Sequence, residues 1–303
     1  MITIKGLKKS YGPKKVLQDI CLSIPDASVF GLVGINGAGK TTLLRMMADV
    51  LRPDEGTVEY DGENIAGNAK KRKELFFLPD DPYYSAGTTV EKLVELYKSF
   101  YSFDDELFAR YEKLFSLERC TPVRNFSKGM KRQAFAALAL ACRPKYLLLD
   151  EAFDGLDPLA RLELKRGIIS LEGTTAVISS HSLRELEDIC SGFALLDGGT
   201  VADAGDIAET LGKVHKFQAA FDGPVAREQL PFDCLTFESE GRVVRIVVRG
   251  ECEEVISALR TLSPIFVEEV KVDFEELFLC EVKSRGSVSY THLRAHETGR
   301  NLV

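Results

Sequence analysis

Four common features are missing from the sequence, and each absence excludes a class of protein. No stretch reaches the roughly 18 uninterrupted apolar residues that a membrane-spanning helix needs. The first residues, MITIKGLKKSYG, lack the apolar core of a secretory signal. We therefore expect a soluble, cytoplasmic protein that reaches a membrane only through a partner.

Long runs of like charge are the third missing feature. No five consecutive residues carry the same charge, and the formal net charge of the 303 residues is −7. Proteins whose main ligand is nucleic acid usually present a strongly basic surface. The charge pattern therefore predicts that nucleic acid is not a partner.

The fourth missing feature is a Cys-x-x-Cys pair. Most of the cysteines lie among apolar neighbours, which favours buried, reduced thiols over a disulfide framework or a zinc site. The sequence contains seven cysteines: Cys21, Cys120, Cys142, Cys190, Cys234, Cys252 and Cys280.

The apolar periodicity that is present predicts an α/β fold. Alternating or continuous apolar residues predict strands at five places: 2–7, 16–24, 28–34, 145–151 and 174–181. The last three contain continuous apolar or β-branched runs, as parallel strands buried on both faces do. A mostly helical block over residues 69–143 interrupts them, and Thr88 and Glu91 stand at capping-box spacing before one of its helices.

The pattern changes after Gly212. Strand-like and helix-like segments then predict a small α+β domain over residues 213–283. Residues 284–303 show little apolar periodicity, and we interpret them as a disordered or non-native tail. His292 and His296 lie four residues apart in that tail, so we do not interpret them as a metal site.

The nine residues 34–42, GINGAGKTT, fit the pattern of a phosphate-binding loop. Glycines let backbone N–H groups turn toward phosphate oxygens, and a following helix presents its positive end to the same anion. Lys40 adds a charge for the β- and γ-phosphates, and the Thr41 hydroxyl is a Mg²⁺ ligand in such loops. A chance glycine-rich turn is the alternative, but a predicted buried strand before the loop and a helix after it argue against that alternative.

Other candidate residues follow two of the predicted strands. The apolar run YLLLD ends at Asp150, which can hold Mg²⁺ through water, and Glu151 follows directly. Because it lies at a strand end, Glu151 can turn toward the γ-phosphate and polarise water. His181 ends another buried strand, where it can reach a phosphate or the attacking water.

A second anion site is predicted at residues 125–133, NFSKGMKRQ. Ser127 is placed to cap the following helix, and Gly129 leaves backbone N–H groups accessible at the positive helix end. Taken alone, the segment is better explained as an ordinary capped helix.

In this order, the motifs over residues 2–212 resemble those of the ATP-binding subunit of ATP-binding cassette (ABC) transporters. The resemblance implies a P-loop cassette with a mostly parallel core sheet, an antiparallel β-subdomain and an inserted helical subdomain. It also implies that two copies enclose two ATP molecules with Mg²⁺, each copy's Ser127 and Gly129 completing the other's site, and that they drive an integral membrane permease at the inner face of the membrane.

Residue by residue, the resemblance implies catalytic roles for Lys40, Glu151 and His181, and it places Asp157 in the loop after the acidic pair. Metal binding would involve Thr41, Asp150 and Asp80. The residues that would contact ATP are Tyr11, Val16, Gly34, Asn36, Gly37, Ala38, Gly39, Lys40, Thr41, Thr42, Ser127 and Gly129.

The sequence departs from the family pattern in two places. The signature reads Phe-Ser-Lys-Gly-Met over residues 126–130, as in relatives that resemble exporters of drugs, peptide antibiotics or sodium. Asp80 stands where the family normally has a glutamine that touches Mg²⁺ and the attacking water. Tyr83 and Tyr84 follow, and they are candidates either for contact with the permease or for packing within the helical block.

These features predict an ATPase that drives transport. The C-terminal segment DFEELFLCEV resembles the closing helix of the exporter branch, which favours export over import. Two alternatives remain: a soluble relative that does not work in transport, and a regulatory cassette that does not hydrolyse ATP. The single cassette and the acidic charge argue against the first, and intact Lys40, Asp150, Glu151 and His181 argue against the second.

Overall fold

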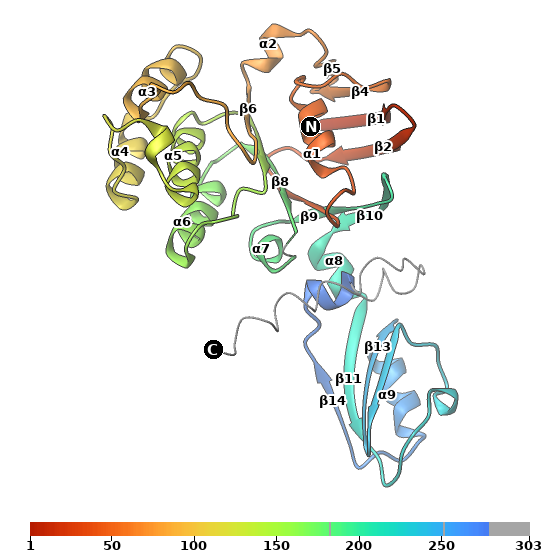
Figure 1. Ribbon diagram of the computed structural model, residues 1–303. Helices are drawn as coiled ribbons and strands as arrows, with labels where there is room; N and C mark the ends of the chain where they lie inside the picture. The colour runs from red at the N-terminus through yellow and green to blue at the C-terminus, as the bar shows by residue number, and fades with distance from the viewer. Residues whose placement is uncertain (182, 251, 279–303) are drawn as a thin grey trace. The chain divides into compact units, whose positions relative to one another are not determined.

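The computed structural model describes residues 1–181, 183–250 and 252–278 (Figure 1). They form two compact units, one comprising Met1–Gly205 and one beginning at Asp206. Cys280, His292, His296 and the predicted tail lie outside the described residues.

A six-stranded sheet forms the centre of the first unit, in the order β10-β9-β3-β8-β7-β6. Neighbouring strands are parallel from β9 through β3, β8 and β7 to β6. Every residue of β7 and β8 is buried. This confirms the predicted α/β class with a parallel core. The strands are β3 (Val29–Val33), β6 (Leu75–Leu78), β7 (Tyr146–Asp150), β8 (Thr175–Ser180), β9 (Gly192–Asp197) and β10 (Thr200–Asp206).

The register of the parallel strands determines where the loops after them meet. Val33 of β3 is paired with Ser180 of β8, and Asp150 of β7 is paired with Ser179 of β8. The three strands therefore end level with one another. Residues that follow β3, β7 and β8 must emerge at the same edge of the sheet.

A second, antiparallel sheet has the order β2-β1-β4-β5. Its apolar face packs into one cluster with α1 and β3, in which Ile2, Leu43 and Leu32 are all fully buried. The predicted β-subdomain is therefore present. Its elements and the helix beside it are β1 (Ile2–Tyr11), β2 (Lys14–Ile24), β4 (Glu55–Tyr60), β5 (Glu63–Asn64) and α1 (Lys40–Met47).

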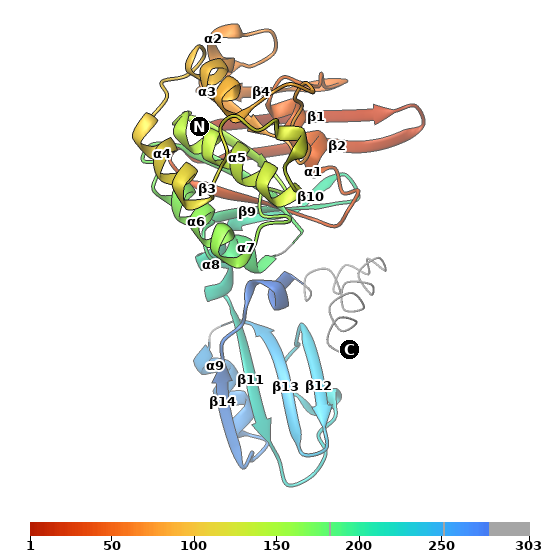
Figure 2. The same ribbon diagram turned by 60° about the vertical axis from the view of Figure 1, so that its left-hand side comes forward.

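The helical block contains α3, α4 and α5, which lie together in both views and are separated from β1 and β2 by β6 in Figure 1 (Figures 1 and 2). The capping prediction for its first long helix is wrong. Thr89 caps α3 by accepting a hydrogen bond from the Lys92 N–H, whereas the Thr88 hydroxyl pairs with Ser85. The helices of the block and those after it are α2 (Ala69–Arg72), α3 (Val90–Lys98), α4 (Asp105–Leu114), the 3-10 helix Val123–Asn125, α5 (Lys128–Ala141), α6 (Pro158–Ile169) and α7 (Leu183–Glu187).

The second unit is an α+β domain. Its sheet has the order β12-β13-β11-β14, and all neighbouring strands are antiparallel. Helix α9 covers one face, where Val255 and Leu259 pack against Phe217. Its elements are α8 (Ile207–Gly212), β11 (Val214–Ala220), the 3-10 helix Arg227–Gln229, β12 (Thr236–Glu240), β13 (Val243–Arg249), α9 (Cys252–Arg260) and β14 (Phe266–Val270).

The prediction that the cysteines are buried is wrong for two of them. Cys21 and Cys120 are exposed, Cys252 is half-buried, and Cys142, Cys190 and Cys234 are buried as expected. Both exceptions follow from position, because Cys21 points outward from β2 and Cys120 lies in a loop. Among the described residues, no helix combines the length and apolarity needed to cross a bilayer.

Asp61 links the antiparallel sheet to the central sheet through hydrogen bonds of its side chain. It occupies the two-residue turn between β4 and β5 at φ 53°, a geometry suited to its Asp-Gly sequence. Its carboxylate accepts hydrogen bonds from Lys145 Nζ and Tyr146 Oη, both at 2.7 Å, and from Lys71 Nζ at 3.0 Å. The Lys145 ammonium is the main reason that the pKa of Asp61 lies well below its ordinary value, and burial opposes this only in part.

We predict that Asp61→Asn lowers the free energy of unfolding of the first unit by about 1–2 kcal/mol at neutral pH, because hydrogen bonds to a charged group are lost. A carboxyl whose pKa is lowered by folding stabilises the fold above its unfolded pKa of about 3.9, and this contribution is lost as the pH falls toward the folded value. Urea unfolding at several pH values, with Asp81→Asn as the control, measures both effects. A difference between Asp61→Asn and wild type that stays constant down to about pH 3 would contradict the prediction.

Candidate functional site

The phosphate-binding loop joins β3 to α1, as the sequence predicts. Gly37 and Gly39 adopt left-handed φ angles of 87° and 106°. Gly39 is the N-cap of α1, and no side chain caps the first turn. The N–H groups at the start of α1 are therefore available to an anion, which the positive end of the helix also attracts.

Gly34 shows why the loop needs a bare backbone. A Cβ atom at this position would lie 2.5 Å from the carbonyl oxygen of Leu196, which belongs to β9 and cannot move independently. Of the other loop residues, Asn36 is exposed, Ala38 is buried, and Thr42 is half-buried.

Lys40 carries a buried positive charge at the base of the loop. Its side chain is only 6% exposed, and Nζ donates a hydrogen bond to the Gly34 carbonyl at 2.6 Å. The same Nζ lies 3.4 Å from Glu151 Oε1. Lys40 thus bridges the phosphate loop and the acidic residue that follows β7.

Asp150 is fully buried at the end of β7. Its Oδ1 accepts hydrogen bonds from Thr41 Oγ1 at 3.1 Å and Ser179 Oγ at 2.7 Å, whereas its buried Oδ2 has no hydrogen-bond partner. Burial raises the pKa of the Asp150 carboxyl, and the Ser179 and Thr41 hydroxyls oppose the rise.

The surroundings of Asp150 fit a magnesium site. A buried carboxylate oxygen without a partner is costly, and Mg²⁺ prefers carboxylate, hydroxyl and water oxygens. Thr41 Oγ1 and the Asp150 carboxylate lie together at the edge of the sheet, and both offer such oxygens. These two residues would hold the ion beside a phosphate bound in the loop.

Glu151 and His181 meet at the same edge of the sheet. Glu151 Oε2 accepts a hydrogen bond from the His181 N–H at 3.2 Å and lies 3.0 Å from His181 Nδ1. Glu151 has a left-handed φ of 47°, which is rare for a residue with a side chain. Neighbouring residues within a strand point to opposite faces of the sheet. Because the chain turns sharply after Asp150, the consecutive residues Asp150 and Glu151 can nevertheless serve one site.

Sequence reasoning missed two residues of the site. Ser179 donates to Asp150 Oδ1 and accepts a hydrogen bond from the Glu151 N–H at 3.0 Å, so it holds both acidic residues in place. Asp154 Oδ1 lies 3.7 Å from His181 Nδ1. The only sequence signal for Ser179 is its position two residues before His181 on a buried strand.

Ser127 caps α5 by accepting a hydrogen bond from the Met130 N–H at 3.1 Å. Gly129 is required by close packing, since a Cβ there would lie 2.8 Å from the Gly155 carbonyl oxygen. Asp157 caps α6 and accepts a hydrogen bond from Gln133 of α5. Within the described part of the chain, no hydrogen bond or ion pair joins Ser127 or Gly129 to the phosphate loop.

Two further candidates lie on the antiparallel sheet. Val16 of β2 is next to the loop, and its carbonyl oxygen would be 3.2 Å from a Cβ at Gly39. Tyr11 ends β1 with half of its surface exposed, and Lys9 Nζ lies 5.7 Å from its ring centroid. An adenine-stacking role for Tyr11 is still a prediction.

Asp80 does not join Thr41 and Asp150 in the structure. It pairs with Arg132 of α5, whose side chain is 1% exposed, while the Asp80 side chain is 53% exposed. A buried guanidinium needs such a partner. A metal role for Asp80 stays a prediction, and it requires that the carboxylate be shared with Arg132.

The two tyrosines after Asp80 have different surroundings. Tyr84 packs within the helical block, with its ring 6.3 Å from that of Phe135 and 5.4 Å from Lys131 Nζ. Tyr83 is 94% exposed. Of the two, Tyr83 presents the larger surface to a partner.

Comparison with known proteins gives consistent matches. A family model described as ABC transporter matches residues 17–154. The ABC transporter ATP-binding protein YtrB of Bacillus subtilis is 31% identical over 294 residues, which cover 93% of this chain and 98% of that protein. The daunorubicin resistance ATP-binding protein DrrA3 of Streptomyces coeruleorubidus is 30% identical, covering 93% of this chain and 94% of that protein. A solved ATP-binding subunit of an ABC transporter is 26% identical with a TM-score of 0.64, covering 69% of this chain and 91% of that chain.

We predict that Gly34→Ala weakens the binding of a fluorescent ATP analogue by at least about tenfold, because the new Cβ displaces the loop from the Leu196 carbonyl. Gly87→Ala is the matched control, since a Cβ at Gly87 meets no atom within 4 Å. Circular dichroism establishes that both variants are folded. Unchanged affinity in a folded Gly34→Ala variant would contradict the role given to the loop.

Proposed function

Because the chain belongs to the ABC transporter family as an ATP-binding subunit, we propose that it hydrolyses ATP and thereby drives a separate membrane permease. The observation that carries the proposal is the meeting of the phosphate loop, Lys40, Asp150, Glu151 and His181 at one edge of the central sheet. A cassette that binds ATP without hydrolysing it would not need a general base such as Glu151 beside Lys40.

The contacts of Lys40 support a sequence of events. Glu151 is the acidic partner of Lys40, so a triphosphate in the loop would compete with Glu151 for this cation. The hydrogen bond from His181 would keep Glu151 in place, and without Lys40 as its partner the carboxylate could orient water and accept its proton. Lys40 and the N–H groups of α1 would stabilise the charge that develops on the transferred phosphoryl group. Bound Mg²⁺ would add neutralisation of charge on the phosphate oxygens.

The position of Ser127 supports action as a pair of subunits. The start of α5 carries the features of an anion site, yet it packs against the segment around Gly155, and among the described residues no hydrogen bond or ion pair joins Ser127 or Gly129 to the loop of its own chain. We infer that it completes the site of a second copy, with the Ser127 hydroxyl and the Gly129 N–H facing the γ-phosphate there. The chain would therefore work as a homodimer that encloses two ATP molecules.

The printed names of several relatives support export, since they refer to daunorubicin resistance, Nod factor export and lantibiotic transport. DrrA3, named for daunorubicin resistance, matches 93% of this chain and 94% of its own length, so the likeness includes the C-terminal domain. The proposed location is the inner face of the membrane, with Tyr83 as a candidate contact with the permease.

We predict that Glu151→Gln slows ATP hydrolysis by roughly 10²–10⁴-fold while ATP still binds, because the amide keeps the size of the side chain but does not accept the proton. Phosphate release and equilibrium ATP binding measure the two properties separately. Glu172→Gln changes an exposed carboxylate of the same unit and serves as the control. Phosphate release at the wild-type rate from Glu151→Gln would show that the assigned role is wrong.

A further inference from the structure

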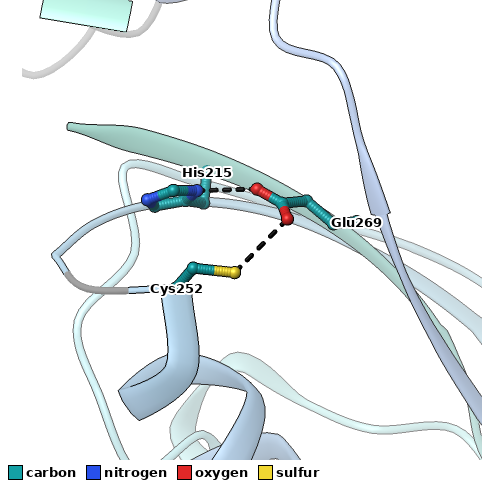
Figure 3. Close-up of side chains that lie close together, drawn as sticks. All are labelled: His215, Cys252 and Glu269. Atoms are coloured by element: carbon teal, nitrogen blue, oxygen red, sulfur yellow. Dashed lines mark hydrogen bonds and ion pairs between the residues drawn. The ribbon is translucent and has the colours of Figure 1, made fainter. Parts of the chain in front are cut away.

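Three side chains of different chemical type converge in the second unit (Figure 3). His215 comes from β11, Cys252 is the first residue of α9, and Glu269 comes from β14. One ligand atom from each lies within 4.8 Å of those from the other two. His215 Nδ1 is 2.7 Å from Glu269 Oε1, and Cys252 Sγ is 3.3 Å from Glu269 Oε2.

The fold fixes these three residues in one place. Glu269 pairs with Phe217 across the antiparallel strands, and His215 lies two residues from Phe217 on the same face of the sheet. That face is covered by α9, which starts at Cys252. The cluster therefore occupies the point where the start of the helix meets two neighbouring strands.

The donor set selects a class of ion. Mg²⁺ and Ca²⁺ take oxygen ligands, whereas thiolate, imidazole and carboxylate together suit Zn²⁺ and similar transition metals. We propose that His215, Cys252 and Glu269 form a binding site for a zinc-like divalent ion, which no sequence spacing revealed because its ligands are far apart in the chain.

The distances are compatible with such an ion. Bonds of about 2.0–2.3 Å in a tetrahedral zinc site separate ligand atoms by roughly 3.3–3.7 Å. One ligand atom from each of the three residues lies within 4.8 Å of the other two, so movements of about 1 Å bring the set to this spacing. The sulfur already lies 3.3 Å from Glu269 Oε2, and the imidazole nitrogen lies 2.7 Å from the other carboxylate oxygen, Oε1. On binding, the ion replaces the thiol proton of Cys252, which is released to solvent.

Access from solvent is also available. The His215 side chain is 18% exposed and the Glu269 side chain is 46% exposed. A metal ion can therefore reach the three ligands, and a water molecule can occupy the fourth position. The bound ion would link the start of α9 to β11 and β14. Its bonds to the three side chains would replace the hydrogen bonds that join Glu269 to His215 and Cys252.

The test uses the reduced full-length chain, stripped of metal with a chelator and titrated with Co²⁺, which reports its ligands by absorption. We expect one high-affinity ion per chain, with a thiolate-to-cobalt charge-transfer band that added Zn²⁺ removes by displacement. Cys252→Ser should abolish the band. His215→Gln and Glu269→Gln should weaken binding by at least about tenfold.

Matched controls separate this site from other ligands of the chain. Cys21→Ser and Cys120→Ser remove the exposed thiols of the first unit, and His292→Gln with His296→Gln removes two further histidines. All four substitutions should leave the band and the affinity unchanged. Absence of the band in wild type, or its persistence in Cys252→Ser, would overturn the proposal. If Cys252→Ser does not fold, undiminished Co²⁺ affinity in His215→Gln and Glu269→Gln would overturn it equally.

Discussion

The buried carboxylate of Asp150 is the constraint on which the candidate site depends. A charge removed from water costs several kcal/mol unless partners compensate for it. Here Thr41 and Ser179 satisfy one oxygen, and the other has no partner. Strands β3, β7 and β8 end level with one another, which brings those hydroxyls to Asp150. The same strand register positions the phosphate loop, so a cation bound at Asp150 would lie beside that loop.

The sequence was sufficient to predict the parts of the molecule that local patterns determine. Continuous apolar runs identified β7 and β8, because strands buried on both faces have no polar side. Ser127 was recognisable as a helix cap, since capping depends on residues only three apart. The meeting of Lys40, Glu151 and His181 followed from one rule, that parallel strands end at one edge of a sheet. A resemblance to a known family assigned roles to the residues that these patterns located.

What the sequence could not predict depends on contacts between distant segments. Ser179 looks like any small residue of a buried strand until its hydroxyl is found on Asp150. The partner of Asp80 is a buried arginine on α5, which no local pattern connects to it. Cys252 lies in a sequence without paired cysteines, and only the strand register and the packing of α9 bring it to Glu269. In each case the interaction is created by the tertiary fold.

The proposed pairing of two copies is the interaction on which ATP hydrolysis would depend, because among the described residues no hydrogen bond or ion pair joins Ser127 or Gly129 to the phosphate loop of their own chain. Light scattering of Glu151→Gln with saturating Mg-ATP, in the presence of the permease, tests this claim most directly. The account predicts a complex containing two copies of the chain with Mg-ATP and dissociation when nucleotide is removed, whereas adding Ser127→Arg should prevent pairing. A single copy of the chain at saturating Mg-ATP would contradict the account.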